Sequence, residues 1–180
     1  ISGPASVTGM FINALNPGPD ATIAEGDLDD DEDASGHRLI DTVTAALIRL
    51  AAVKGDLNYY DSKRQKRYEL YGGELPFFMH RERGLHLDET GVTIDENPIP
   101  ASILGTGLTI FHAGRVQIEK GQGLYFYLPK MESSEEARFW RNFFDFSRDY
   151  LSIQSDAVIR TIALIESLPI AYQMEEVLYE

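Results

Sequence analysis

Four polar residues that each follow a short apolar run are the side chains of this sequence best placed to do chemistry. They are Asn16, Arg81, Lys130 and Glu166. The runs are continuous rather than alternating, which is typical of parallel strands buried on both faces. In an α/β barrel these side chains would meet at the carboxyl ends of the strands, where barrel active sites lie. Arginine, lysine and glutamate together would suit an anionic substrate and a metal ion. The alternative is that polar residues end strands because the chain is leaving the core.

The elements that would position these residues alternate between strands and helices. Strands are predicted at residues 10–16, 75–79, 124–128 and 159–165. Helices are predicted at residues 39–53, 103–116 and 133–150, with another beginning near residue 169. A hairpin is predicted at residues 57–70, and the acidic run at residues 27–33 is predicted to be a solvated loop. This order of strands and helices predicts an α/β fold.

Charge and composition exclude several classes of protein. The chain has 180 residues, 16 Lys+Arg against 29 Asp+Glu, a formal net charge of −13, and no cysteine. Eight of the acids lie in residues 20–33, which contain no base. Such a chain lacks the basic face that non-specific nucleic-acid binding requires, and it can form neither disulfides nor thiolate metal sites. No apolar run reaches the roughly 18 to 20 residues that a membrane-spanning helix needs.

The second half of the chain carries a specific family resemblance. Residues 125–133 and 136–140, YFYLPKMES and EARFW, are similar to the malate synthase pattern YFYLPKxES…EARxW. Residues 164–167 and 173–179, LIES and QMEEVLY, resemble that family's LIET…xMxEILYEL. These blocks include Lys130 and Glu166, two of the residues that follow apolar runs.

Two earlier blocks extend the resemblance to nearly all of the chain. Gly3-Pro4 with MFINALN at residues 10–16 resembles the family's GP…KMVINALN, and RERGLHL at residues 81–87 resembles its RxRGxHL. The blocks come in family order. The acidic run departs from the family's ADFED, which either residues 24–28 or residues 26–30 could match, and Gly105 stands where the family has an aspartate.

The resemblance implies a partial TIM (β/α)8 barrel of roughly five strands. Residues 1–180 would be the N-terminal portion of the barrel domain, with residues 20–35 as an acidic loop. The implied reaction is the Mg²⁺-dependent condensation of acetyl-CoA with glyoxylate and water, which gives malate and CoA in the glyoxylate cycle. The implied compartment is the cytoplasm or a peroxisome or glyoxysome.

The resemblance also implies roles for the four polar residues. Arg81 would be catalytic through charge stabilisation. Arg81, Lys130 and Asn16 would bind substrate, and Glu166 would bind the metal. The family's second metal ligand and its catalytic aspartate lie beyond the position of Glu180, so the 180 residues alone are expected to be inactive.

Two alternatives come from other classes of protein. A citrate-lyase-type carbon–carbon lyase would use the same barrel, a strand-end arginine and a glutamate-held Mg²⁺. A non-catalytic piece or interaction module would fit the altered acidic run. The block at residues 125–130 together with Trp140 favours malate synthase. No nucleic-acid or membrane partner is expected, and the sequence leaves the oligomeric state open.

Overall fold

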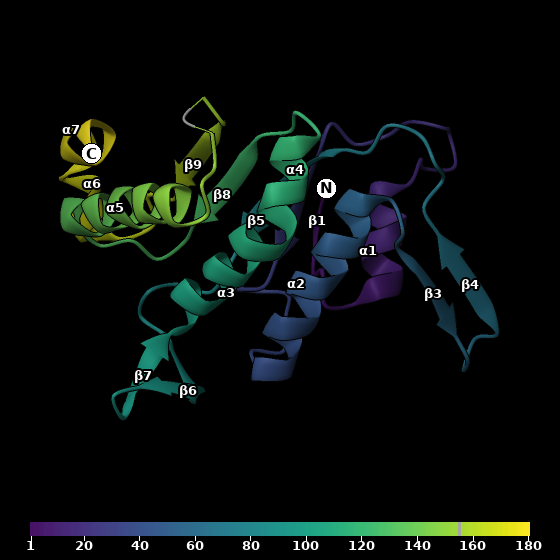
Figure 1. The fold of residues 1–180 in the computed structure, drawn as a ribbon, viewed down its shortest axis with the longest axis horizontal. Coiled ribbons are helices and arrows are strands. Elements are labelled where there is room, and N and C mark those ends of the chain that lie inside the picture. Colours follow the sequence, from purple (N-terminus) through teal and green to yellow (C-terminus); the bar gives the residue numbers. More distant parts are fainter. Residues whose placement is uncertain (155) are drawn as a thin grey trace.

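The computed structural model describes residues 1–154 and 156–180 of the chain. Its centre is a five-stranded parallel sheet in which the strands follow one another in chain order, β1-β2-β5-β8-β9 (Figure 1). The strands are β1 (Ser2–Gly3), β2 (Gly26–Asp30), β5 (Phe77–Arg81), β8 (Leu124–Leu128) and β9 (Ile159–Ala163). Parallel neighbours in chain order, joined by helices, are the arrangement of successive barrel strands, and the described sheet is not closed. The prediction of a partial barrel of about five strands is confirmed.

Helices connect these strands, as a parallel sheet requires. They are α1 (Thr8–Leu15), α2 (Leu39–Lys54), α3 (Ala101–Thr109), a π-helical turn (Ile110–Gly114), α4 (Arg115–Glu119) and α5 (Ser134–Tyr150). Helices α6 (Leu168–Ala171) and α7 (Met174–Tyr179) follow β9. Helix α5 begins where the sequence predicts, because the Ser133 hydroxyl accepts the Glu136 N–H at 3.3 Å. Helix α2 ends at Gly55, whose φ of 86° is a left-handed conformation that glycine adopts at little cost.

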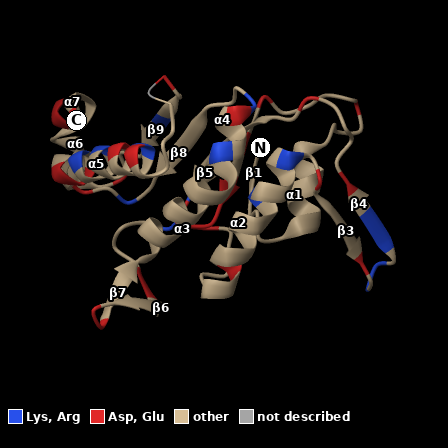
Figure 2. Ribbon diagram, in the orientation of Figure 1, with Lys and Arg blue, Asp and Glu red and all other residues tan. Residues whose placement is uncertain are grey.

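Two antiparallel hairpins project from the sheet and its helices (Figure 1). The first, β3 (Asn58–Asp61) with β4 (Lys66–Glu69), confirms the predicted hairpin and carries basic residues on β4 (Figure 2). The second, β6 (Asp88–Ile94) with β7 (Asn97–Pro100), carries acidic residues (Figure 2). The first lies between α2 and β5 and the second between β5 and α3, and each hairpin forms a sheet of its own, separate from the parallel sheet.

Two hydrophobic clusters pack the helices against the sheet. One joins α1 and α2 to the sheet through residues such as Phe11, Ile48 and Phe78. The other joins α5 to β8, where the Phe126 and Phe144 rings lie 5.1 Å apart and Trp140 stacks on Phe144 at 5.6 Å. Aromatic side chains of this kind bury a large apolar area each, so they account for much of the attachment of α5.

Two predictions about the first thirty residues are wrong. Residues 10–15 belong to helix α1 rather than a strand, and Asn16 caps the helix, because a short apolar run has no periodicity that separates the two. The acidic run is not a solvated loop. Its first part is strand β2, which lies between β1 and β5, and Asp29 is fully buried. Strand β2 spans Gly26–Asp30, one of the two segments that could match the family's ADFED.

Candidate functional site

Charged side chains from four strands gather where the strands end. We call this group the rim cluster, and its members are Asp30, Glu32, Asp33, Arg81, Lys130 and Glu166. Asp30 ends β2, Arg81 ends β5, and Lys130 and Glu166 follow β8 and β9 within three residues. Because the strands are parallel, these are all carboxyl ends, so the rim predicted for Arg81, Lys130 and Glu166 forms as expected.

Arg81 is held by the acidic residues that follow β2. Its Nε donates to Asp30 Oδ1 at 2.9 Å, one Nη donates to Asp33 at 3.1 Å, and the other lies 3.6 Å from a Glu32 oxygen. The guanidinium also lies 5.6 Å from the centre of the Tyr127 ring. Burial opposes the ionisation of Asp30, but Arg81 and the backbone N–H groups of Asp33 and Glu32 together outweigh it, and the pKa of Asp30 is lowered. The same pairing raises the pKa of Arg81, so this guanidinium remains charged.

Lys130 and Glu166 form a second pair at the rim. The Lys130 backbone N–H donates to Glu166 Oε1 at 2.8 Å, and its Nζ donates to Oε2 at 2.9 Å. Lys130 has a φ of 53°, in the left-handed region that residues with a Cβ rarely adopt. Residues in such conformations are often found at functional sites. Burial raises the pKa of Glu166, but the Lys130 bonds outweigh it and the pKa is lowered. Glu166 is therefore an ionised carboxylate at neutral pH.

Glu32 links the two pairs of the rim cluster. Its carboxylate lies 3.6 Å from Arg81 and 3.8 Å from the Lys130 ammonium, and Oε2 has no hydrogen-bond partner among the described residues. Burial, followed by the neighbouring Asp33, raises the pKa of Glu32. With four carboxylates and two cations, the rim cluster carries an excess of negative charge.

Asn16 does not belong to the rim cluster. It caps the end of α1, where its side-chain amide donates to the carbonyl of Glu69 at 2.8 Å and its side-chain oxygen accepts the N–H of Tyr71 at 3.1 Å. These partners lie in the segment that leads into β5. The prediction that Asn16 follows a strand and meets the other three residues at the rim is therefore wrong, because the element before it is a helix.

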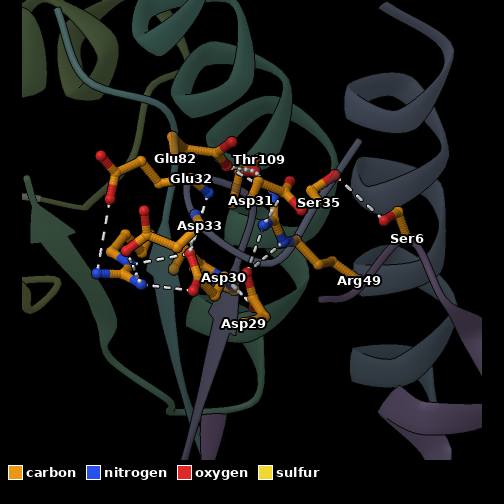
Figure 3. Close-up of polar contacts among 12 residues, drawn as sticks. Ser6, Asp29, Asp30, Asp31, Glu32, Asp33, Ser35, Arg49, Glu82 and Thr109 are labelled. Atoms are coloured by element: carbon orange, nitrogen blue, oxygen red, sulfur yellow. Dashed lines mark hydrogen bonds and ion pairs between the residues drawn. The ribbon is translucent and has the colours of Figure 1, made fainter. Parts of the chain in front are cut away.

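A buried ionic group that the sequence did not reveal lies behind the rim. Arg49 of α2 is fully buried and contacts Asp29, Asp31 and Glu82 (Figure 3). His80 adds a contact of 2.5 Å between its Nδ1 and Asp29. One signal was available in the sequence: Arg49 is the only charged residue in the apolar stretch of residues 45–53.

Burial changes the acidity of this group. It raises the pKa of Asp31 from 3.8 to about 7, although the nearby Arg49 opposes the change. Burial alone would lower the pKa of Arg49, but Asp29, Glu82 and Asp31 outweigh it and the pKa is raised. The arginine is thus a permanent cation that compensates several buried carboxylates.

A parallel, helix-covered arc of strands with ionised acids and bases at its carboxyl ends is the architecture of a barrel enzyme domain. The family described as "Malate synthase, TIM barrel domain" matches residues 77–180. The chain belongs to this family.

Similar proteins extend the match over the whole chain. A malate synthase from Myxococcus xanthus (strain DK1622) is 39% identical over 180 residues, covering 100% of this chain and 32% of the relative. A malate synthase from Streptomyces clavuligerus is 37% identical over 182 residues, with the same coverage, and a glyoxysomal malate synthase from Cucurbita maxima is 36% identical over 183 residues, with 31% of the relative covered. The chain spans about a third of the length of these relatives. In the described part of the chain, no helix combines the length and apolarity needed to cross a membrane.

Proposed function

We propose that the whole protein is a malate synthase, which condenses acetyl-CoA with glyoxylate and water to give malate and CoA. The observation that carries the proposal is the meeting of Arg81, Lys130 and Glu166 at one rim. Membership of the malate synthase family supports the same reaction and favours it over a citrate-lyase-type cleavage. Acetyl-CoA and glyoxylate are accordingly the proposed partners, and the cytoplasm or a peroxisome or glyoxysome is the proposed compartment.

Arg81 binds and stabilises negative charge in this proposal. Its guanidinium is permanently charged and planar, so it can bind a small carboxylate and the enolate that forms when acetyl-CoA loses a methyl proton. Asp30 raises its pKa further, which excludes Arg81 as the base that takes the proton. Lys130 adds a second positive charge 2.9 Å from Glu166 and is proposed to bind substrate.

Glu166 is the proposed magnesium ligand, and the rim cluster fits such an ion. Its possible ligands are carboxylate oxygens, which Mg²⁺ prefers, and one or two carboxylates suffice because the ion keeps several waters. Each Glu166 oxygen accepts one hydrogen bond and so keeps a second acceptor site. Glu32 Oε2, which accepts no hydrogen bond among the described residues and lies 3.6 Å from an Arg81 Nη, adds a further oxygen nearby. Among residues 1–154 and 156–180, no three His, Cys, Asp or Glu side chains are placed to hold one metal ion together. When bound, Mg²⁺ would polarise the glyoxylate aldehyde as a Lewis acid.

Exchanging Glu166 for glutamine tests the proposal in the whole protein. Glu166→Gln keeps the shape but removes the negative charge that a hard cation requires, so we expect malate formation to need at least about 10-fold more Mg²⁺. Malate production is measured across a Mg²⁺ titration. Glu176→Gln, a similar change on helix α7, is the control and should leave the titration unchanged. Wild-type protein that forms no malate would refute the function and favour the non-catalytic alternative, whereas an unchanged Glu166→Gln titration would remove Glu166 from the site.

A further inference from the structure

The rim residues Asp30 and Arg81 are neighbours on adjacent parallel strands. The register of β2 with β5 places Asp30 opposite Arg81, and the two side chains are joined by hydrogen bonds. Residues along a strand alternate between its two faces. Asp29, Asp31 and Glu82, which adjoin this pair in the chain, are accordingly buried on the helix side of the sheet.

On the helix side, all three of these carboxylates contact one guanidinium. Arg49 Nε donates to Asp29 at 2.7 Å, and its two Nη atoms donate to Glu82 at 2.6 Å and to Asp31 at 3.0 Å (Figure 3). The Thr109 hydroxyl accepts from the same Nη as Glu82, at 2.8 Å, and donates to Glu82 at 2.8 Å. One side chain of α2 therefore joins the carboxyl ends of β2 and β5 to α3.

We propose that Arg49 is a positioning residue, which clamps the ends of β2 and β5 together from behind so that Asp30 and Arg81 are aligned at the rim. This role rests on the proposed function only for its effect on the reaction. The contacts by which Arg49 holds the two strand ends do not depend on the reaction. A backbone hydrogen bond from the Asp31 N–H to the Arg81 carbonyl, 2.8 Å long, crosses between the two strands at the clamped position.

The chemistry of the side chain explains why an arginine is required. A guanidinium offers five donors in a fixed planar fork, whereas a lysine ammonium is a compact charge on a flexible stem. Arg49 uses its fork to reach carboxylates from two different strands at once. Arg49→Lys keeps the positive charge but loses this geometry, so it separates the clamp from simple charge compensation.

Amide hydrogen exchange in the whole protein tests the clamp directly. In Arg49→Lys, we expect peptides covering residues 26–33 and 77–83 to exchange at least about 10-fold faster than in the wild type, because the strand ends open locally. Ile48→Ala is the matched control. Ile48 is the adjacent buried residue of α2 and belongs to the hydrophobic cluster instead. It should lower overall stability without this selective change. Unchanged exchange in Arg49→Lys, or the same exchange pattern in both variants, would overturn the proposal.

Kinetics test the effect on the reaction. Because misplacement of a reacting group by about 1 Å can reduce the rate about 100-fold, we expect kcat of Arg49→Lys to fall by about that factor. The KM for acetyl-CoA should change less than about 2-fold. The exposed Arg38, changed to lysine, should leave both constants unchanged. Wild-type protein without malate synthesis would refute the proposed function, and the exchange comparison would still decide the clamp. A normal kcat in a variant with faster exchange would refute the positioning role.

Discussion

Replacing Asp27 by asparagine should change how the stability of the protein depends on pH. Asp27 lies on β2, is 1% exposed, and neither carboxylate oxygen has a hydrogen-bond partner among the described residues. Burial, with a smaller contribution from Asp29, raises its pKa from 3.8 to about 7. The folded protein therefore holds this carboxyl group protonated at pH values where an unfolded chain has lost the proton.

The direction of the effect follows from proton linkage. Between pH 3.8 and about 7, the folded state binds more protons at Asp27 than the unfolded state, so the free energy of unfolding falls as the pH rises. Well above the folded-state pKa of about 7, Asp27 is ionised in both states and the free energy of unfolding falls no further. A pKa change from 3.8 to about 7 corresponds to at most about 4 kcal/mol. The asparagine side chain cannot ionise, so the Asp27→Asn variant should equal the wild type near pH 4 and be more stable by up to that amount at pH 8.

Urea unfolding of the whole wild-type protein and the Asp27→Asn variant, measured from pH 4 to pH 8, checks this prediction. Asp30 and Glu166, whose lowered pKa values give the opposite dependence on pH, are present in both proteins and cancel in the comparison. Asp56→Asn, a change at an exposed carboxylate, is the control and should leave the pH dependence unchanged. Parallel curves for Asp27→Asn and wild type would show that Asp27 is ionised in the folded protein and would refute the reasoning.

Two further predictions concern helices α3 and α5. Gly105→Ala should destabilise the protein by about 1 to 3 kcal/mol, because its methyl group would lie 2.8 Å from the Cδ of the clamped Glu82. Gly107→Ala is the control and should leave the stability unchanged, because the nearest atom to its methyl group would be in Phe143, at 4.0 Å. Urea unfolding of the two variants is the test. Ser133→Ala removes the acceptor for the Glu136 N–H and should lower the unfolding free energy by about 1 kcal/mol, as measured by urea unfolding. Ser133→Asp should restore the unfolding free energy, because aspartate is also a good N-cap acceptor. An unchanged unfolding free energy in Ser133→Ala would contradict the capping role.

The sequence alone determined the elements whose patterns are local. The apolar runs of β5, β8 and β9, the capped start of α5 and the glycine that ends α2 were all predicted, because each depends on residues a few positions apart. Parallel strands follow from their continuous apolar character. The meeting of Arg81, Lys130 and Glu166 follows in turn, since parallel strands bring their carboxyl ends to one edge of the sheet.

Tertiary structure decided what local patterns could not. Strand β2 contains one apolar residue, Leu28, and its acids became buried only because β1 and β5 pair with it and Arg49 reaches it from α2. Residues 10–15 became part of a helix, and Asn16 at its end lies away from the rim. The interactions that bury β2 join residues far apart in the chain. A buried charge is tolerated only where such a distant partner compensates it, so no pattern within a single segment could have revealed it.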